Sequence, residues 1–223
     1  MSAPVFSERP ASGEPTGLLV LHHGRGADEH DLLVLADALD PERRLHVVTP
    51  RGPLKVPGWP GNHWYVVPRV GFPDRDTFRA SYELLGSFHD ELWQRTGLGP
   101  AQTVLGGFSM GAVMSYALAL GAGRPAPAGI LAFSGFIPTV DGWTPHLQDR
   151  SRTRVFVAHG SNDPVISVDF ARDAHAQLLA GGLEVDYREF PGGHEIDRAG
   201  VPAAGDWLHE TISGVTPDSR PGA

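Results

Sequence analysis

The stretch Gly107-Phe108-Ser109-Met110-Gly111 has the form G-x-S-x-G and decides the fold of this chain. An apolar run at 103–105 precedes it, and small and apolar residues typical of a buried helix follow at 112–120. This context predicts a buried strand, a sharp turn and a helix. Such a turn holds the central serine in a strained conformation and lifts its hydroxyl clear of the sheet. The flanking residues are glycines because a Cβ there would collide with the neighbouring strand and helix.

Two residues suited to proton transfer follow Ser109 along the chain. Asp163 lies just past the carboxyl end of a buried strand in the segment 154–165, and His194 lies in a Gly-rich loop after an alternating strand at 184–190. Ser, then Asp, then His is the order in which α/β-hydrolases carry their catalytic triad. All three residues are expected at carboxyl ends of strands, where open α/β sheets build their sites.

The predicted roles follow from proton chemistry. A serine hydroxyl is a poor nucleophile near neutral pH, so Ser109 needs an adjacent base, and His194 can take its proton and return it to a leaving group. Asp163 can hold the imidazole in one tautomer and stabilise its charged form. Two backbone N–H groups are expected to bind the oxyanion: that of Met110, and that of Arg25 in the loop after a strand at 17–22.

Five motifs lie in order along most of the chain, with regular spacing: LHHGRG at 21–26, GFSMG at 107–111, FSGFIP at 133–138, HGSNDPV at 159–165 and GHE at 193–195. In these motifs the chain resembles the phospholipase/carboxylesterase family of α/β-hydrolases, which includes the acyl-protein thioesterases. The resemblance implies a Ser109, Asp163 and His194 triad, with Arg25 and Met110 as oxyanion donors.

The resemblance also implies hydrolysis of esters, and in some branches of thioesters, without a cofactor, and a weak homodimer. The thioesterase branch usually has Gln where this chain has Met110, and a small or apolar residue where it has Arg25. These departures favour a small-molecule ester as the substrate over a long acyl chain carried by a protein.

Composition excludes several other classes of protein. The net charge of −8 leaves no basic surface for nucleic acid, and no apolar run is long enough to span a membrane. The first 17 residues lack the apolar core of a signal peptide, and the chain has no cysteine, which favours a cytoplasmic location and excludes a cysteine nucleophile. Lys55 is the only lysine among many arginines, which we interpret as a bacterial coding bias.

The neighbours His22 and His23 point to opposite faces of a strand, so no metal site is expected.

The remaining segments complete an alternation of strands and helices, which predicts a mostly parallel central sheet flanked by helices: an α/β-hydrolase fold without a large lid domain. Residues 1–215 are expected to form a single domain and residues 216–223 a flexible tail. Further strands are predicted at 45–50 and 129–137, with a leading edge strand at 5–7. Apolar helical faces fall within 32–39, 78–92 and 170–178.

The long irregular stretch 51–76 and the segment 137–143 are rich in aromatic and apolar side chains. Loops of this length are usually functional, so we expect both segments to wall a substrate pocket. The alternative is that the aromatic side chains belong to the core beneath a long loop. The predicted pocket residues are Trp59, Trp64, Tyr65, Phe72, Ile137 and Trp143.

The favoured hypothesis is a serine carboxylesterase that forms an acyl-enzyme at Ser109. A thioesterase or lysophospholipase that acts on longer acyl chains is an alternative within the hydrolases. An acyltransferase would pass the same acyl group to an alcohol or amine. A non-catalytic ligand-binding module has no need of all three triad groups in order, which argues against it.

Overall fold

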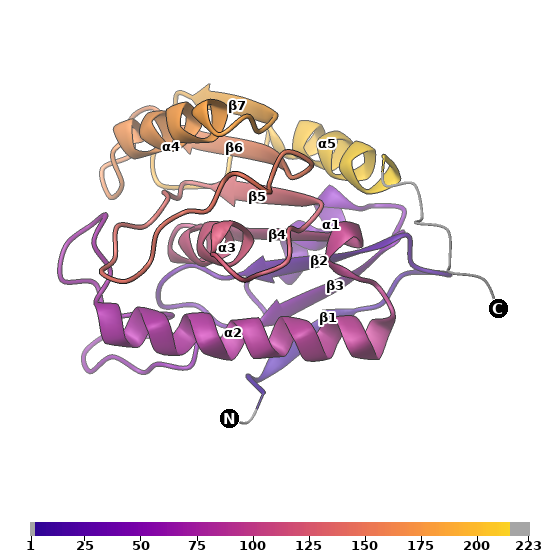
Figure 1. Cartoon of the computed structure of the whole chain (residues 1–223), viewed down its shortest axis with the longest axis horizontal. Coiled ribbons are helices and arrows are strands. Elements are labelled where there is room, and N and C mark those ends of the chain that lie inside the picture. Colours follow the sequence, from indigo (N-terminus) through magenta and orange to yellow (C-terminus); the bar gives the residue numbers. More distant parts are fainter. Residues whose placement is uncertain (1–2, 215–223) are drawn as a thin grey trace.

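The computed structural model describes residues 3–214, so the tail expected at 216–223 lies outside the described residues. Within them, seven strands form one sheet in the order β1-β3-β2-β4-β5-β6-β7 (Figure 1). β1 runs antiparallel to β3, and the other neighbouring strands are parallel. The strands are β1 (Phe6–Arg9), β2 (Gly17–His22), β3 (Leu45–Pro50), β4 (Thr103–Phe108), β5 (Gly129–Phe133), β6 (Arg154–Gly160) and β7 (Val185–Phe190).

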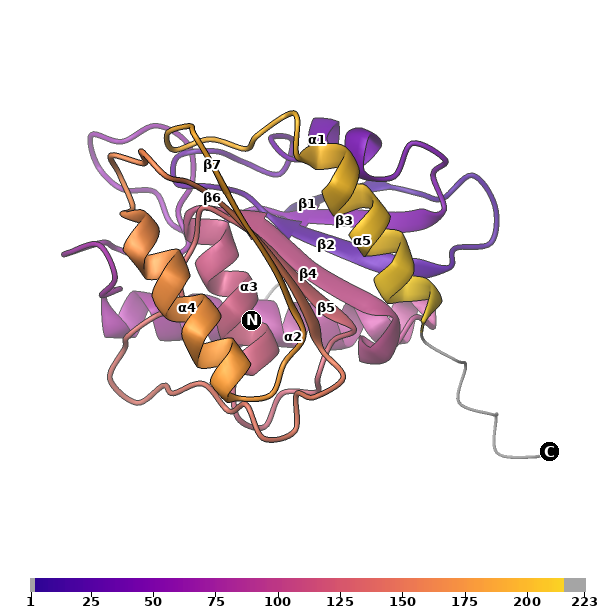
Figure 2. The ribbon, with the colours of Figure 1, turned by 90° about the horizontal axis from the view of Figure 1, so that it is seen from above.

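Helices cover both faces of this sheet, as predicted (Figure 2). On one face, α1 and α5 pack over a buried cluster that includes Leu19 and Leu21 of β2. On the other face, α2, α3 and α4 pack over a cluster that includes Leu18 and Val20. No helix in residues 3–214 combines the length and apolar character needed to cross a bilayer. The helices are α1 (Leu33–Leu39), α2 (Arg75–Thr96), α3 (Met110–Leu120), α4 (Val168–Ala180) and α5 (Val201–Ser213), with a 3₁₀ turn at Pro100–Gln102.

The strand order reverses at β2, and this reversal decides where a site can form. The chain passes from β2 to β3 on one side and then returns to β4 on the other. In the β2–β4 register, His22 lies opposite Gly107, so the loops that follow the two strands leave the sheet side by side. Ligands of open α/β sheets bind at such a switch point, beyond the carboxyl ends of the strands.

The predicted strands are found, with two changes of extent. The strand expected at 129–137 ends at Phe133, because the next residue, Ser134, has a φ of 51° that extended backbone cannot adopt. The expected edge strand at 5–7 forms as Phe6–Arg9 and pairs antiparallel with the end of β3.

Candidate active site

Ser109 occupies the turn between β4 and α3. Its φ of 54° and ψ of −121° lie outside the regions that side chains normally allow, as expected for a strained serine at this position. Its N–H donates to the carbonyl of Phe133 at 2.9 Å, and its own carbonyl accepts from Val113 N–H at 3.2 Å. These bonds anchor the strained residue to β5 on one side and to α3 on the other.

The glycines on either side of Ser109 allow the turn to press against β2. A Cβ on Gly107 would approach the carbonyl oxygen of His22 to 2.6 Å, and a Cβ on Gly111 would overlap the same oxygen. The predicted steric reason for both glycines is therefore confirmed, and the neighbour they must avoid is the end of β2.

The structure brings the side chains of Ser109, His194 and Asp163 into one hydrogen-bonded chain. His194 Nε2 lies 2.8 Å from Ser109 Oγ, and His194 Nδ1 lies 2.7 Å from Asp163 Oδ2. Both distances fall within the usual range for hydrogen bonds. Since a carboxylate only accepts, Nδ1–H donates to Asp163 and the lone pair of Nε2 faces the serine hydroxyl.

Asp163 is held as a buried carboxylate by several donors. Burial acts to raise the pKa of Asp163, but the N–H groups of Ile166 and Val165 and the ring of His194 outweigh it and lower that pKa. The two N–H groups donate to Oδ1 at 2.9 and 2.8 Å, which leaves Oδ2 for His194.

His159, at the end of β6, also contacts the carboxylate. Its Nε2 donates to the carbonyl of Ile166 at 2.8 Å and lies 3.3 Å from Asp163 Oδ2. The side chain is fully buried, and burial lowers the pKa of His159, so the ring is neutral. The sequence predicts a structural role for His159 at the end of a strand, but it does not predict the contact with Asp163.

Backbone contacts between the loops after β6 and β7 keep Asp163 and His194 together. Ser161 N–H donates to the carbonyl of Phe190 at 2.8 Å, and Asn162 N–H donates to that of Gly192 at 3.0 Å. The ring of Phe108 also lies 4.9 Å from the imidazole of His194. These contacts fix the imidazole between the serine and the carboxylate.

Two backbone N–H groups beside Ser109 are available to a ligand. Within residues 3–214, neither the N–H of Arg25 nor that of Met110 donates to a protein acceptor. Met110 is the first residue of α3, where the helix dipole favours negative charge. Arg25 follows β2, whose end is paired with β4. Both groups are therefore suited to bind an oxyanion.

Trp64 contacts the loop after β2 and the side chain of Met110. Its indole Nε1 donates to the carbonyl of His23 at 2.9 Å, and its backbone N–H approaches Met110 Sδ at 3.3 Å. His23 in turn donates from Nδ1 to the carbonyl of Gly24 at 2.7 Å and accepts at Nε2 from Gly52 N–H at 2.9 Å. The loop after β2 is thus tied to both α3 and the stretch after β3.

A small cavity opens beside Ser109, with a volume of about 60 Å³. Its wall is mostly apolar, and residues that sequence analysis did not single out supply most of it. Val67 and Val70 come from the stretch 51–76 that was expected to wall the pocket, and Phe136 and Val165 stand in two of the motifs. Only the folded arrangement shows that these particular residues line the cavity. The lining residues are Arg25, Tyr65, Val67, Val70, Ser109, Met110, Phe136, Val165 and Ile166.

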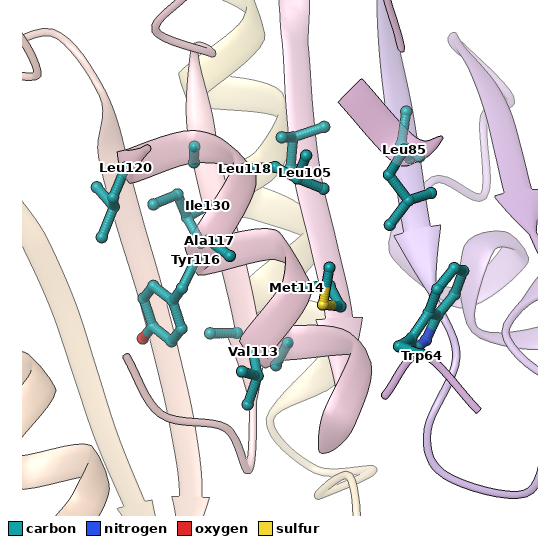
Figure 3. Packing of buried hydrophobic residues seen from close by; sticks show 14 of the residues in the cluster. Trp64, Leu85, Leu105, Val113, Met114, Tyr116, Ala117, Leu118, Leu120 and Ile130 are labelled. Carbon is teal, nitrogen blue, oxygen red and sulfur yellow. The ribbon is translucent and has the colours of Figure 1, made fainter. Parts of the chain in front are cut away.

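Of the six predicted pocket residues, only Tyr65 lines this cavity. Trp64 is fully buried, and it lies in the core with Leu85 and Met114 (Figure 3). Trp143 packs edge-on to Phe78 and lines a separate groove beside α2.

The other three predicted pocket residues also lie outside the cavity. Trp59 and Phe72 are exposed and stack against the guanidinium groups of Arg25 and Arg69. Ile137 packs against the core. The alternative of aromatic core residues beneath a long loop therefore describes Trp64, whereas Trp59 and Phe72 lie on the surface.

Within residues 3–214, no three His, Cys, Asp or Glu side chains are grouped so that they could hold a metal ion. His22 instead forms a hydrogen bond with Ser115: the distance between His22 Nδ1 and Ser115 Oγ is 2.8 Å. Burial lowers the pKa of His22 well below its ordinary value, so the ring is neutral.

The family model for Phospholipase/Carboxylesterase matches residues 8–212, a span that includes every residue of the site. The chain belongs to this family. A solved structure of an esterase, PE8, is 30% identical, has a TM-score of 0.76 and covers 94% of this chain and 100% of its own. The carboxylesterase of Bacillus cereus is 24% identical with a TM-score of 0.81, and the match covers 92% of this chain and 93% of that one. This likeness confirms the predicted α/β-hydrolase fold.

Among curated relatives, acyl-protein thioesterase 1 of Debaryomyces hansenii is 28% identical over 155 residues. The match covers 68% of this chain and 66% of that protein. Family membership and these relatives together identify the chain as a hydrolase of the esterase or thioesterase type.

Proposed function

We propose that the chain is a serine carboxylesterase that hydrolyses small-molecule esters through a Ser109, His194 and Asp163 triad. The observation that carries this proposal is the continuous hydrogen-bonded chain from Ser109 Oγ through His194 to Asp163. Its geometry suits proton transfer from the serine to the imidazole in a single step.

In the acylation step, Ser109 Oγ attacks the ester carbonyl carbon while its proton passes to His194 Nε2. Asp163 stabilises the imidazolium that forms, through its contact with Nδ1. The carbonyl oxygen becomes an oxyanion that accepts from the N–H groups of Arg25 and Met110. The tetrahedral intermediate then collapses, and the alcohol leaves with the proton from Nε2.

In the deacylation step, water replaces the alcohol. His194 Nε2 takes a proton from the water as the water oxygen attacks the acyl carbon. The second oxyanion occupies the same pair of N–H groups. Collapse releases the carboxylic acid and returns the proton to Ser109 Oγ.

The lining of the cavity supports an ester with a hydrocarbon acyl group. The apolar wall from Phe136 and Ile166 suits a hydrocarbon chain.

We also keep the expectations of a bacterial, cytoplasmic, single-domain enzyme that needs no cofactor and forms a weak homodimer. These stay predictions.

The test is a series of p-nitrophenyl esters from acetate to palmitate. We expect kcat/KM to be highest for the short acyl chains, because Met110 and Arg25 depart from the thioesterase pattern and favour a small-molecule ester. Ser109→Ala should lose turnover by a factor on the order of 10⁶ while the protein stays folded. A maximum at long chains, or full activity in Ser109→Ala, would overturn the proposal.

A thioesterase is the second candidate, because curated relatives carry that name. Matched oxygen esters and thioesters of one acyl group separate the two functions. For an esterase, we expect the ester-to-thioester ratio of kcat/KM to exceed the ester-to-thioester ratio of the uncatalysed hydrolysis rates. A preference for the thioester would assign the chain to the other function.

A further inference from the structure

Arg25 presents a second feature of the site, distinct from its backbone N–H. Arg25 lines the same cavity as Ser109, and the residue is exposed at the protein surface. The guanidinium carbon lies 3.7 Å from the centroid of the Trp59 ring, so the two groups stack. Stacking restricts the guanidinium while its N–H groups, which lie in the plane of the group, stay available to a ligand.

Within residues 3–214, the Arg25 guanidinium forms no ion pair and donates no hydrogen bond. Most other arginines of the described chain have a carboxylate partner. Arg51 pairs with Glu29, Arg154 with Glu184 and Arg172 with Glu189. Arg25 is therefore a cation without an ion-pair partner among residues 3–214, and it belongs to the wall of the cavity that holds Ser109.

The remaining wall offers one further polar group. Tyr65 lines the cavity, and its hydroxyl has no hydrogen-bond partner among residues 3–214. Burial raises the pKa of Tyr65, so the hydroxyl keeps its proton and can donate. An anionic group that enters the cavity would meet the guanidinium and find a neutral donor nearby.

We propose that Arg25 binds a carboxylate of the substrate, so that the preferred substrates are short esters that themselves carry a carboxylate. This inference rests on the proposed esterase function and adds the substrate class. A guanidinium can donate two parallel hydrogen bonds to the two oxygens of one carboxylate, which favours this anion over a neutral group of the same shape. Because Arg25 and Ser109 line the same cavity, we expect this carboxylate within a few bonds of the ester carbonyl.

The test compares anionic esters with neutral esters of the same shape. Monomethyl succinate carries its carboxylate on the acyl side, and methyl isocaproate replaces it by an isopropyl group. Acetoxyacetate carries its carboxylate on the alcohol side, and isobutyl acetate is its neutral match. The readout is the anionic-to-neutral ratio of kcat/KM within each pair. Partial unfolding of a variant cancels in this ratio, because both esters meet the same preparation.

We expect Arg25→Gln to lower this ratio by about tenfold in at least one pair, because the charge and the fork are lost together. Arg25→Lys should fall in between, since it keeps the charge without the planar fork. The pair that responds shows which half of the ester carries the carboxylate. Added salt should lower the wild-type ratio, because Arg25 is exposed.

Arg69→Gln is the matched control. Arg69 also stacks on an aromatic ring, that of Phe72, at 3.7 Å, but does not line the cavity. We expect its ratios to equal those of the wild type. The inference would be overturned if wild type and Arg25→Gln had equal anionic-to-neutral ratios, or if Arg69→Gln lost as much of this ratio as Arg25→Gln. Neither result would contradict the proposed esterase function, because the wild type would still hydrolyse esters. Turnover of none of the four esters by the wild type would contradict the proposed function and, with it, this inference.

Discussion

Both carboxylate oxygens of Asp163 have hydrogen-bonding or ion-pair partners. Oδ1 accepts the N–H groups of Val165 and Ile166, and Oδ2 faces His194 and His159. The carboxylate therefore cannot rotate without breaking several contacts. This arrangement fixes the tautomer of His194, because only an Nδ1–H can face Oδ2.

Asp163→Asn should lower kcat/KM by about 10³–10⁴-fold without loss of the fold. The amide oxygen would keep the two N–H donors at the position of Oδ1, which turns the NH₂ group toward His194. Nδ1 would then accept, Nε2 would carry the proton, and the imidazole could not take the proton of Ser109. Kinetics on a short p-nitrophenyl ester measure the loss.

Asp173→Asn is the matched control for this substitution, because it changes an exposed carboxylate on α4. We expect it to keep wild-type kcat/KM. An Asp163→Asn variant as active as this control would contradict the tautomer account.

The sequence predicts the three hydrogen-bonded side chains of the candidate site better than it predicts their surroundings. Ser109, Asp163 and His194 can be selected because each stands in a motif of fixed order. The sequence predicts the apolar cavity wall only as the stretch 51–76, because nothing distinguishes Val67 and Val70 from core residues until the chain folds. Trp64 was assigned to the pocket, yet it is buried and braces the loop that carries Arg25.

At the scale of elements, the site depends on β2 and β4 being neighbours. The glycines around Ser109 bring α3 against the end of β2, and the pairing of His22 with Gly107 sets the Arg25 loop beside the serine. The loops after β6 and β7, from the second half of the chain, then bring Asp163 and His194 to Ser109. The loop after each strand carries one part of the site.

The sequence predicts these elements well because their apolar patterns are strong and turn residues separate them. The end of β5 is the exception. The segment 129–137 is apolar to its end, but the positive φ of Ser134 breaks the strand. A single backbone conformation of this kind leaves no periodic signal, so the segment was predicted too long.

Across the whole molecule, buried neutral histidines link stability to pH. His89 lies in α2 and its ring is 5.5 Å from that of His22. Burial, helped by the charge of Arg124, lowers the pKa of His89 to about 3. Burial also lowers the pKa of His22. An unfolded chain binds protons at these residues below about pH 6.5, whereas the folded chain does not.

The free energy of unfolding should therefore fall as the pH is lowered from 7.5 to 5. Linkage gives about 2 kcal/mol at pH 5 for each fully buried histidine of ordinary unfolded pKa. Urea unfolding across this range measures the slope. His89→Phe should remove roughly the share of one histidine, because it deletes the titrating group.

His30→Gln is the control, because this histidine is exposed, and we expect it to keep the wild-type slope. Carboxylates with a lowered pKa, such as Glu29 beside Arg51, change the free energy of unfolding only at more acidic pH. A slope in His89→Phe equal to that of the wild type would show that His89 has no part in the effect.

The most direct test of the central claim is covalent labelling of the nucleophile. The protein is treated with a fluorophosphonate, digested and analysed by mass spectrometry. We predict one adduct, on Ser109, that is absent in Ser109→Ala and forms much more slowly in His194→Ala. An adduct on another serine, such as Ser134 or Ser161, or no adduct on a folded wild-type protein, would contradict the account.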